Sequence, residues 1–174
     1  MSVKKILTEP NKLLRQVSEP VEKVGEEERK LMDDMIETMY AAPGIGLAAI
    51  QIGVPKRIIV MDISKNESEK KPMFFVNPVI KNKNSEKDTY EEGCLSVPDQ
   101  FAEIERPSSC EVEYLDYEGK KQLLKAQGLL ATCIQHEIDH LEGILFIDYL
   151  SKLKKEMIIK KLSKQQSKPD RIIV

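Results

Sequence analysis

The sequence predicts an α+β fold in which mostly antiparallel sheets pack around a central helix, with an N-terminal helix before them and a C-terminal helix after them. Residues 25–42 and 128–142 have helical periodicity, whereas the stretch from about 57 to 124 reads as strands. Runs of strands flanked by helices are typical of this class. The length of 174 residues fits one domain.

The N-terminal helix is predicted from apolar residues at helical spacing over residues 25–42. Three consecutive acidic residues stand in its first turn, where the helix dipole favours negative charge. Pro43 and Gly44 end it. The apolar residues are Leu31, Met32, Met35, Ile36, Met39 and Tyr40.

Three segments predict strands, namely 57–63, 73–80 and 110–116. The first two are rich in β-branched or aromatic residues, and Pro78 marks an edge or a bend in the second. Apolar and acidic residues alternate in the third, so one of its faces is expected to be buried. A hairpin turn is expected at 118–119.

The helix at 128–142 is apolar on more than one face, so it is expected to be largely buried, with Gly143 as its C-terminal cap. A further helix is expected at about 149–165, followed by a basic tail. It is expected to be amphipathic, with one apolar side formed by Leu150, Leu153, Met157, Ile158 and Leu162. Residues 149–174 carry a net charge of +6 and the rest of the chain −8. No apolar run reaches the 18 residues of a membrane span, and residues 1–14 do not resemble a secretory signal. A cytoplasmic location without membrane partners is therefore expected.

The central helix contains the pattern HExxH, formed by His136, Glu137 and His140, and these are the only histidines in the chain. Residues four apart share a helix face, so both imidazoles can reach one metal ion with the glutamate beside them. The alternative is two histidines that are hydrogen-bonded within a core. We favour the metal site because the surrounding helix is apolar, and buried polar groups need partners.

Two side chains do not complete a metal site. The extended metalloprotease pattern fails because Phe146 stands at its third histidine position, while Glu156 on the next helix remains open. Cys133 shares the histidine face but lies about 7.5 Å along the axis, so it is expected to line the wall. Cys110 follows the apolar face of its strand. Cys94, at a strand end, is either a ligand or a buried thiol.

Three separated segments resemble the motifs of peptide deformylases. GIGLAAIQ at 44–51 is similar to GxGLAAxQ, EGCLS at 92–96 matches the second motif, and QHEIDHLEG at 135–143 is similar to QHExDHLxG. The order and spacing also match, over nearly the whole chain, although Ile50 stands where many relatives have proline. The resemblance implies a single catalytic domain, residues 1–174, that removes the N-formyl group from the initiator Met of new polypeptides as formate.

The resemblance also implies the residues of the active site. It implies one divalent metal ion per chain, usually ferrous iron, with zinc, nickel or cobalt also able to bind. The implied ligands are Cys94, His136 and His140. Glu137 would activate water, while the Gln51 side chain and the Leu95 backbone N–H would stabilise the oxyanion.

The resemblance further implies that the substrate lies along 44–46 like an added strand. The residues implied for substrate binding are Ile45, Gly46, Glu92, Leu129 and Cys133, together with His136. Arg106 and Asp139 would form an ion pair behind the metal helix and support its ligands. Phe101 departs from relatives that carry a peptide-contacting arginine there.

The partners implied are N-formylmethionyl nascent peptides and, through the basic C-terminal helix, the ribosome. The alternative to ribosome binding is that this helix only packs against the domain and exposes its lysines to solvent. A zinc endopeptidase and a catalytically inactive binding module are the rival functions. The bacterial type of the family fits a cytoplasmic location, and an organellar origin stays open.

Overall fold

The computed structural model describes residues 2–64, 66 and 68–166, and it confirms the predicted α+β fold. Five strands form one antiparallel sheet in the order β1-β2-β3-β6-β7, and β4 and β5 form a separate antiparallel pair. The bounds are β1 (Gly46–Ala48), β2 (Ile58–Met61), β3 (Met73–Lys83), β4 (Lys87–Cys94), β5 (Val97–Pro107), β6 (Ser109–Leu115) and β7 (Lys121–Gln127).

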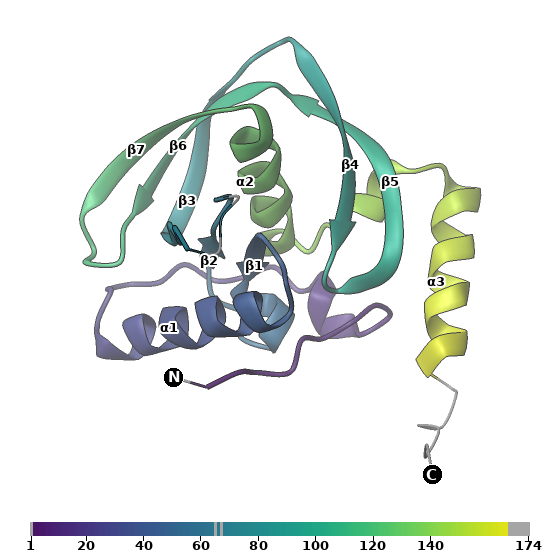
Figure 1. The fold of residues 1–174 in the computed structure, drawn as a ribbon, viewed down its shortest axis with the longest axis horizontal. Coiled ribbons are helices and arrows are strands. Elements are labelled where there is room, and N and C mark those ends of the chain that lie inside the picture. Colours follow the sequence, from purple (N-terminus) through teal and green to yellow (C-terminus); the bar gives the residue numbers. More distant parts are fainter. Residues whose placement is uncertain (1, 65, 67, 167–174) are drawn as a thin grey trace.

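Helix α2 (Gly128–Leu141) lies between the large sheet and the β4–β5 hairpin (Figure 1). Its prediction as a largely buried helix at 128–142 is confirmed, since ten of its residues are buried. Ile134 and Ile138 pack with Phe75 and Val112 of the sheet in one core cluster. Gly143 follows the helix with a φ of 73° and lies against the Arg15 backbone, where a Cβ atom would overlap it. The helix that carries the HExxH pattern is thus fixed from several sides.

Helix α1 (Glu26–Ala41) confirms the prediction for residues 25–42. It packs with β1 and β2 in a second core cluster, in which Met32, Met35 and Met39 are fully buried. The turn at 118–119 is also confirmed, since Gly119, with a φ of 83°, connects β6 to β7. Two short 3-10 helices, η1 (Lys12–Arg15) and η2 (Ala49–Ile52), flank this part of the fold.

Strand β3 is irregular at Pro78, so the bend that was expected there as one of two alternatives is confirmed. The strand lies between β2 and β6, but its pairing with β2 ends at Val76, before the proline. The pairing register shifts between Val76 and Val79, and Asn77 has a φ of 51°. The Asn77 side chain bonds the backbone of Val21 in both directions, at 2.8 and 2.7 Å. A bulge just beyond the end of the β2 pairing therefore accommodates the proline, which has no backbone N–H to donate.

The C-terminal region begins with η3 (Phe146–Tyr149) and continues as α3 (Lys152–Gln166). Helix α3 starts three residues later than predicted, where the Ser151 hydroxyl accepts a hydrogen bond from the Lys154 backbone N–H at 3.3 Å. Ile158 and Leu162 pack against β5 and η3 in a third cluster. None of the helices in the described residues is long and apolar enough to cross a membrane.

The apolar side expected on this helix is partly wrong. Leu153 and Met157 were expected to share it with Ile158 and Leu162, yet their exposed fractions are 69% and 52%. The packed face is centred instead on the residues that contact β5, and α3 lies at the margin of the molecule (Figure 1). Lys168 and Arg171 of the expected basic tail lie outside the described residues.

Candidate metal centre and active site

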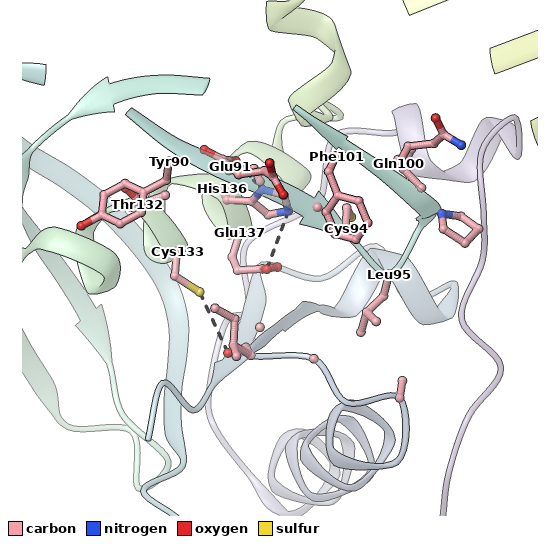
Figure 2. Close-up of a pocket in the computed structure, with 18 of the residues that line it drawn as sticks. Tyr90, Glu91, Cys94, Leu95, Gln100, Phe101, Thr132, Cys133, His136 and Glu137 are labelled. Atoms are coloured by element: carbon pink, nitrogen blue, oxygen red, sulfur yellow. Dashed lines mark hydrogen bonds and ion pairs between the residues drawn. The ribbon is translucent and has the colours of Figure 1, made fainter. Parts of the chain in front are cut away.

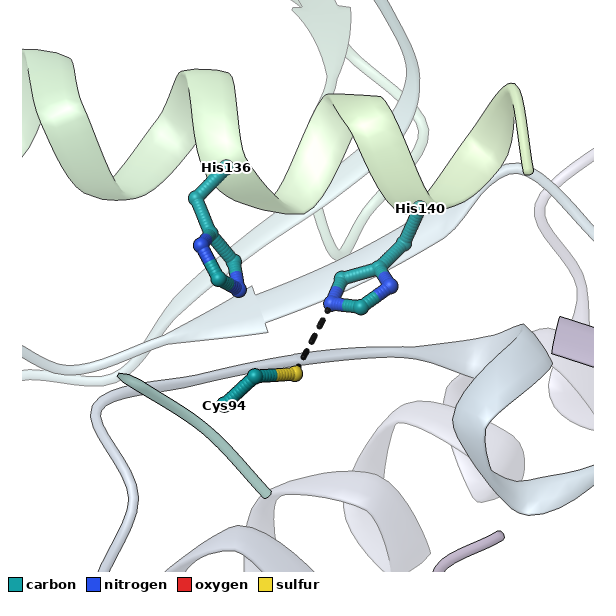
Figure 3. Close-up of side chains that lie close together, drawn as sticks. All are labelled: Cys94, His136 and His140. Carbon is teal, nitrogen blue, oxygen red and sulfur yellow. Dashed lines mark hydrogen bonds between the residues drawn. The ribbon is translucent and has the colours of Figure 1, made fainter. Parts of the chain in front are cut away.

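The fold brings together Cys94, His136 and His140, although 41 residues lie between the cysteine and the first histidine (Figure 3). The histidines stand one turn apart on α2, and the cysteine ends β4. One potential ligand atom from each residue lies within 4.8 Å of the others, and Cys94 Sγ is 3.4 Å from His140 Nε2. Ligands of a tetrahedral ion at 2.0–2.3 Å stand roughly 3.3–3.8 Å apart. The cluster therefore fits one divalent ion with small adjustments.

The imidazoles differ in what holds their other ring nitrogen. His136 Nδ1 lies 2.8 Å from Glu92 Oε1, which directs Nε2 towards the centre of the cluster. His140 Nδ1 is buried and has no hydrogen-bond partner in the part of the chain that the structure describes. Burial lowers the pKa of His136, but the contacts with Cys94 and Glu92 outweigh burial, and the pKa is well above its usual value. Burial and the neighbouring His136 hold the pKa of His140 well below its usual value.

Glu137 is buried beside these three side chains, with Oε1 4.0 Å from His136 Nε2. Its other oxygen, Oε2, lacks a hydrogen-bond partner among the described residues. Burial raises the pKa of this carboxyl group to about 7, an effect that the positive groups of His136 and Arg106 only partly offset. A carboxylate with such a pKa can both accept and release a proton near neutral pH. Its position and its pKa are suited to general acid–base chemistry.

Gln51 and Leu95 both lie beside Cys94. Gln51 lies on η2 and is fully buried, with its Nε2 atom 3.6 Å from Cys94 Sγ. Leu95 follows Cys94 directly, in the two-residue turn between β4 and β5. Its side chain lies against Gly44, where a Cβ atom would be 2.6 Å from Leu95 Cδ1. An amide side chain and a backbone N–H are therefore available beside the cysteine.

A cavity of about 560 Å³ opens over this cluster. Its walls come from segment 42–46, the β4–β5 hairpin and helix α2. Tyr90, Thr132 and Cys133 lie at one end, Leu95 and Phe101 at the other, with Glu137 between them (Figure 2). The residues expected to bind substrate all line it: Ile45, Gly46, Glu92, Leu129, Cys133 and His136. Sequence reasoning missed Tyr90 and Thr132, which carry no motif and are recognisable only once the walls face each other.

Arg106 connects Glu92 and Asp139 behind the cluster. This buried side chain donates to Asp139 Oδ2 at 2.8 Å, so the expected ion pair is present. It also donates to both oxygens of Glu92, at 2.7 and 3.0 Å. The Tyr149 hydroxyl donates to Asp139 Oδ2 at 2.7 Å. Burial lowers the pKa of Arg106, but the two carboxylates more than compensate and raise it.

Glu92 therefore makes contacts beyond the expected one. It lines the cavity, as expected, and it also contacts residues behind the cavity wall. Its carboxylate bridges Arg106 and His136, which links the ion pair to a potential metal ligand. Neither this bridge nor the contribution of Tyr149 was anticipated, because both depend on contacts between segments remote in sequence. Carboxylate partners of this kind fix the tautomer and the orientation of a ligating imidazole.

Comparisons with known proteins agree with this geometry. The family model described as polypeptide deformylase matches residues 3–156. The chain is 82% identical over 174 residues to a peptide deformylase of Pelagibacter ubique strain HTCC1062, covering 100% of both chains. It is 58% identical over 164 residues to one of Rhizobium meliloti strain 1021, covering 94% of both. The solved peptide deformylase of Ehrlichia chaffeensis in complex with actinonin is similar with a TM-score of 0.91, at 50% identity, over 97% of this chain and 100% of that one. The chain therefore belongs to the polypeptide deformylase family.

Proposed function

We propose that this chain hydrolyses the N-formyl group of N-formylmethionyl nascent peptides and releases formate, as a metal-dependent amidohydrolase. The observation that carries the proposal is the cluster of Cys94, His136 and His140 with Glu137 beside it, in a chain that matches the family along most of its length. The full chain, residues 1–174, is proposed to act as one catalytic domain in the cytoplasm.

The proposed ligands are the thiolate of Cys94 and the Nε2 atoms of His136 and His140. A divalent ion held there supplies Lewis acidity, which lowers the pKa of water from about 15.7 to about 7 and polarises a carbonyl group. Three protein ligands leave a further position open for chemistry. We propose Fe²⁺ as the physiological ion, with Zn²⁺, Ni²⁺ or Co²⁺ able to bind the same donor set.

Glu137 is proposed as the general acid–base. It takes a proton from the water whose oxygen attacks the formyl carbon. It then passes that proton to the nitrogen of methionine as the C–N bond breaks. The products are formate and a free amino terminus. The buried carboxyl group, with its pKa near neutrality, is suited to both transfers.

The Gln51 side-chain amide and the Leu95 backbone N–H are proposed to donate hydrogen bonds to the oxygen that becomes negative in the tetrahedral intermediate. Such donors act most strongly where water is excluded. The complete burial of Gln51 supports this role, as does the position of Leu95 directly after Cys94.

The methionine side chain is proposed to occupy the end of the cavity lined by Leu129, Cys133 and Ile45, with Glu92 and His136 beside it. Gly46 would let the peptide backbone lie along β1 as an added strand. Cys133 is proposed as a wall residue, because burial raises its thiol pKa well above the usual value and keeps it neutral. Arg106 and Asp139 are proposed to hold this arrangement in place through Glu92.

The decisive experiment compares formyl-Met-Ala with acetyl-Met-Ala, using protein that is loaded with metal and protected from oxidation. Formate release from the formyl peptide, without release of acetate from the other, is the expected result. The acetyl compound is the matched control because it adds one methyl group at the reacting carbon. Cleavage of an internal peptide bond would indicate an endopeptidase, and no turnover of either compound would indicate a binding module. Both outcomes would contradict the proposal.

We also propose that α3 docks on the ribosome, from which formylated peptides emerge. Five lysines of the helix are exposed to solvent, and phosphate contacts favour such side chains. They are Lys152, Lys154, Lys160, Lys161 and Lys164. Lys155 instead pairs with Asp148 at 2.8 Å and is proposed to fix the helix to the domain. The exposed Leu153 and Met157 lie on the same helix.

A further inference from the structure

Ser96 is the last residue of the EGCLS motif and is completely buried. It forms the β4–β5 turn together with Leu95. Its hydroxyl oxygen accepts a hydrogen bond from Gln51 Nε2 at 3.0 Å. A buried hydroxyl group in this position connects the turn that follows Cys94 with the 3-10 helix that carries Gln51.

The orientation of the Gln51 amide is fixed by its neighbours. Its Oε1 atom accepts a hydrogen bond from the Ala48 backbone N–H at 2.9 Å. If the amide were rotated by 180°, its NH₂ group would face that N–H, and two donors would meet. The NH₂ group must therefore face Ser96 and the metal centre.

The two hydrogens on Gln51 Nε2 then have different positions. Ser96 accepts one of them, and the other lies on the side of Cys94 Sγ, 3.6 Å from the nitrogen. An amide NH₂ group is planar, so fixing one hydrogen also fixes the direction of the other. The second hydrogen is therefore directed at Cys94 Sγ, beside the proposed position of the substrate oxygen.

We propose that Ser96 is a positioning residue that aims the Gln51 amide at the oxyanion, an inference that rests on the proposed function. Without the hydroxyl, the buried N–H would lose its acceptor, and the amide, held only by its bond from the Ala48 N–H, would no longer be fixed in one direction. A displaced donor stabilises the transition state less, because its effect depends on preorganised geometry. Ser96 itself does not touch the substrate.

A double-mutant cycle with Ser96→Ala and Gln51→Ala tests the inference, with kcat and KM for formyl-Met-Ala as readouts. Loss of the oxyanion donor in Gln51→Ala is expected to lower kcat about 10²–10³-fold. Ser96→Ala is expected to lower kcat about tenfold or more with little change in KM. If the serine acts through Gln51, adding Ser96→Ala to Gln51→Ala should change kcat less than about twofold, because the two effects are coupled.

The control is Ser18→Ala, which removes a buried hydroxyl group that has no hydrogen-bond partner among the described residues. Its turnover should stay near that of the wild type, and metal content and Tm are measured for every variant. If Ser96→Ala does not fold, Ser96→Cys carries the same cycle, since its somewhat larger thiol leaves no cavity but accepts hydrogen bonds only weakly.

Two outcomes would overturn the positioning role. One is normal kcat in a folded Ser96 variant, and the other is an equal loss in the presence and absence of Gln51. Wild-type protein that releases no formate would instead remove the proposed function, and this inference with it. The two failures are therefore distinguishable.

Discussion

The carboxylate of Glu137 lies against the backbone of Gly46, so closely that a Cβ atom on this glycine would stand 2.5 Å from Oε1. Gly46→Ala should therefore displace the carboxylate while β1 keeps its pairing. A displacement of about 1 Å in a catalytic group can cost about 10²-fold, and we expect kcat to fall by about that factor. Kinetics with a formyl peptide, together with Tm, check this prediction.

The matched control is Gly25→Ala, because a Cβ atom there would make only ordinary contact with Glu28, at 3.4 Å. That variant should keep its activity. Wild-type kcat in Gly46→Ala would show that the carboxylate can move without cost.

Alanine at any one of the three proposed ligands should deplete bound metal, since the remaining two donors do not complete a site. Elemental analysis of purified protein measures this directly. Cys110→Ala is the control, because that thiol lies in the core cluster with Val112 and Ile134 and does not belong to the group of three potential ligands. Full metal occupancy in Cys94→Ala would refute the assignment of that ligand.

Glu137→Gln should separate metal binding from catalysis. Glutamine keeps the size and a hydrogen-bonding group but cannot take a proton from water. We expect unchanged metal content and a loss of about 10²–10⁴-fold in kcat, the usual scale for a general acid–base. Turnover close to that of the wild type in a metal-loaded sample would exclude the proposed role.

Asp148 should make stability depend on pH. Burial raises the pKa of its carboxyl group, but Arg15 at 2.6 Å, Lys155 at 2.8 Å and the Leu145 N–H at 3.1 Å outweigh this and lower it. Because the pKa is lowered in the folded state, the ionised carboxylate stabilises the fold. This stabilisation is fully present above the unfolded-state pKa of about 3.9. That stability is lost as pH falls through the folded-state pKa. Asp148→Asn should therefore cost about 1–2 kcal/mol at pH 7 and progressively less below about pH 4.

Urea unfolding of both proteins across that pH range gives the difference in unfolding free energy. Glu22→Gln, at an exposed position, is the control and should follow the wild type throughout. A difference between Asp148→Asn and the wild type that does not depend on pH would mean that the carboxylate charge contributes nothing.

Ribosome docking by α3 should depend on its exposed lysines. The structure argues against deleting the helix, because Ile158 and Leu162 cover part of the core. Glutamine is instead introduced at Lys152, Lys154, Lys160 and Lys161. Co-sedimentation with ribosomes should weaken at least tenfold and depend less on salt, since each lost phosphate contact lowers the salt slope by about 1. Turnover of a short formyl peptide should not change.

The control makes the same change of charge elsewhere on the surface, with glutamine at Lys87, Lys120, Lys121 and Lys125, which are also exposed. Equal weakening in both variants would show only a general effect of charge. Unchanged co-sedimentation in the α3 variant would contradict the docking proposal and would mean that these lysines are only solvated surface residues.

The elements that periodicity predicted are those that bury a continuous face. Helices α1 and α2 begin and end within one residue of their expected positions, because regular apolar spacing and flanking glycines mark them. The HExxH spacing likewise places two imidazoles together on α2. In α3 the spacing was compatible with several faces, and only the contact with β5 decided that Leu153 and Met157 stay outside.

The third member of the metal cluster could not be derived from spacing. Cys94 and Cys110 were both available, and the residues alone left the choice between ligand and buried thiol open. What decides it is the return of the β4–β5 hairpin over α2, a contact between segments more than 40 residues apart. The same holds for Glu92, whose link to His136 depends on that hairpin.

The presence of only two imidazoles, both in the cluster with Cys94, makes them a built-in spectroscopic reporter. With no other histidine in the chain, every imidazole resonance in an NMR spectrum comes from His136 or His140. The two are distinguishable, because a carboxylate 2.8 Å from Nδ1 of His136 shields a proton there from exchange, and Nδ1 of His140 has no such partner among the described residues. Ion exchange, inhibitor binding and slow oxidation of the neighbouring thiol could thus be followed in intact protein without introducing a label.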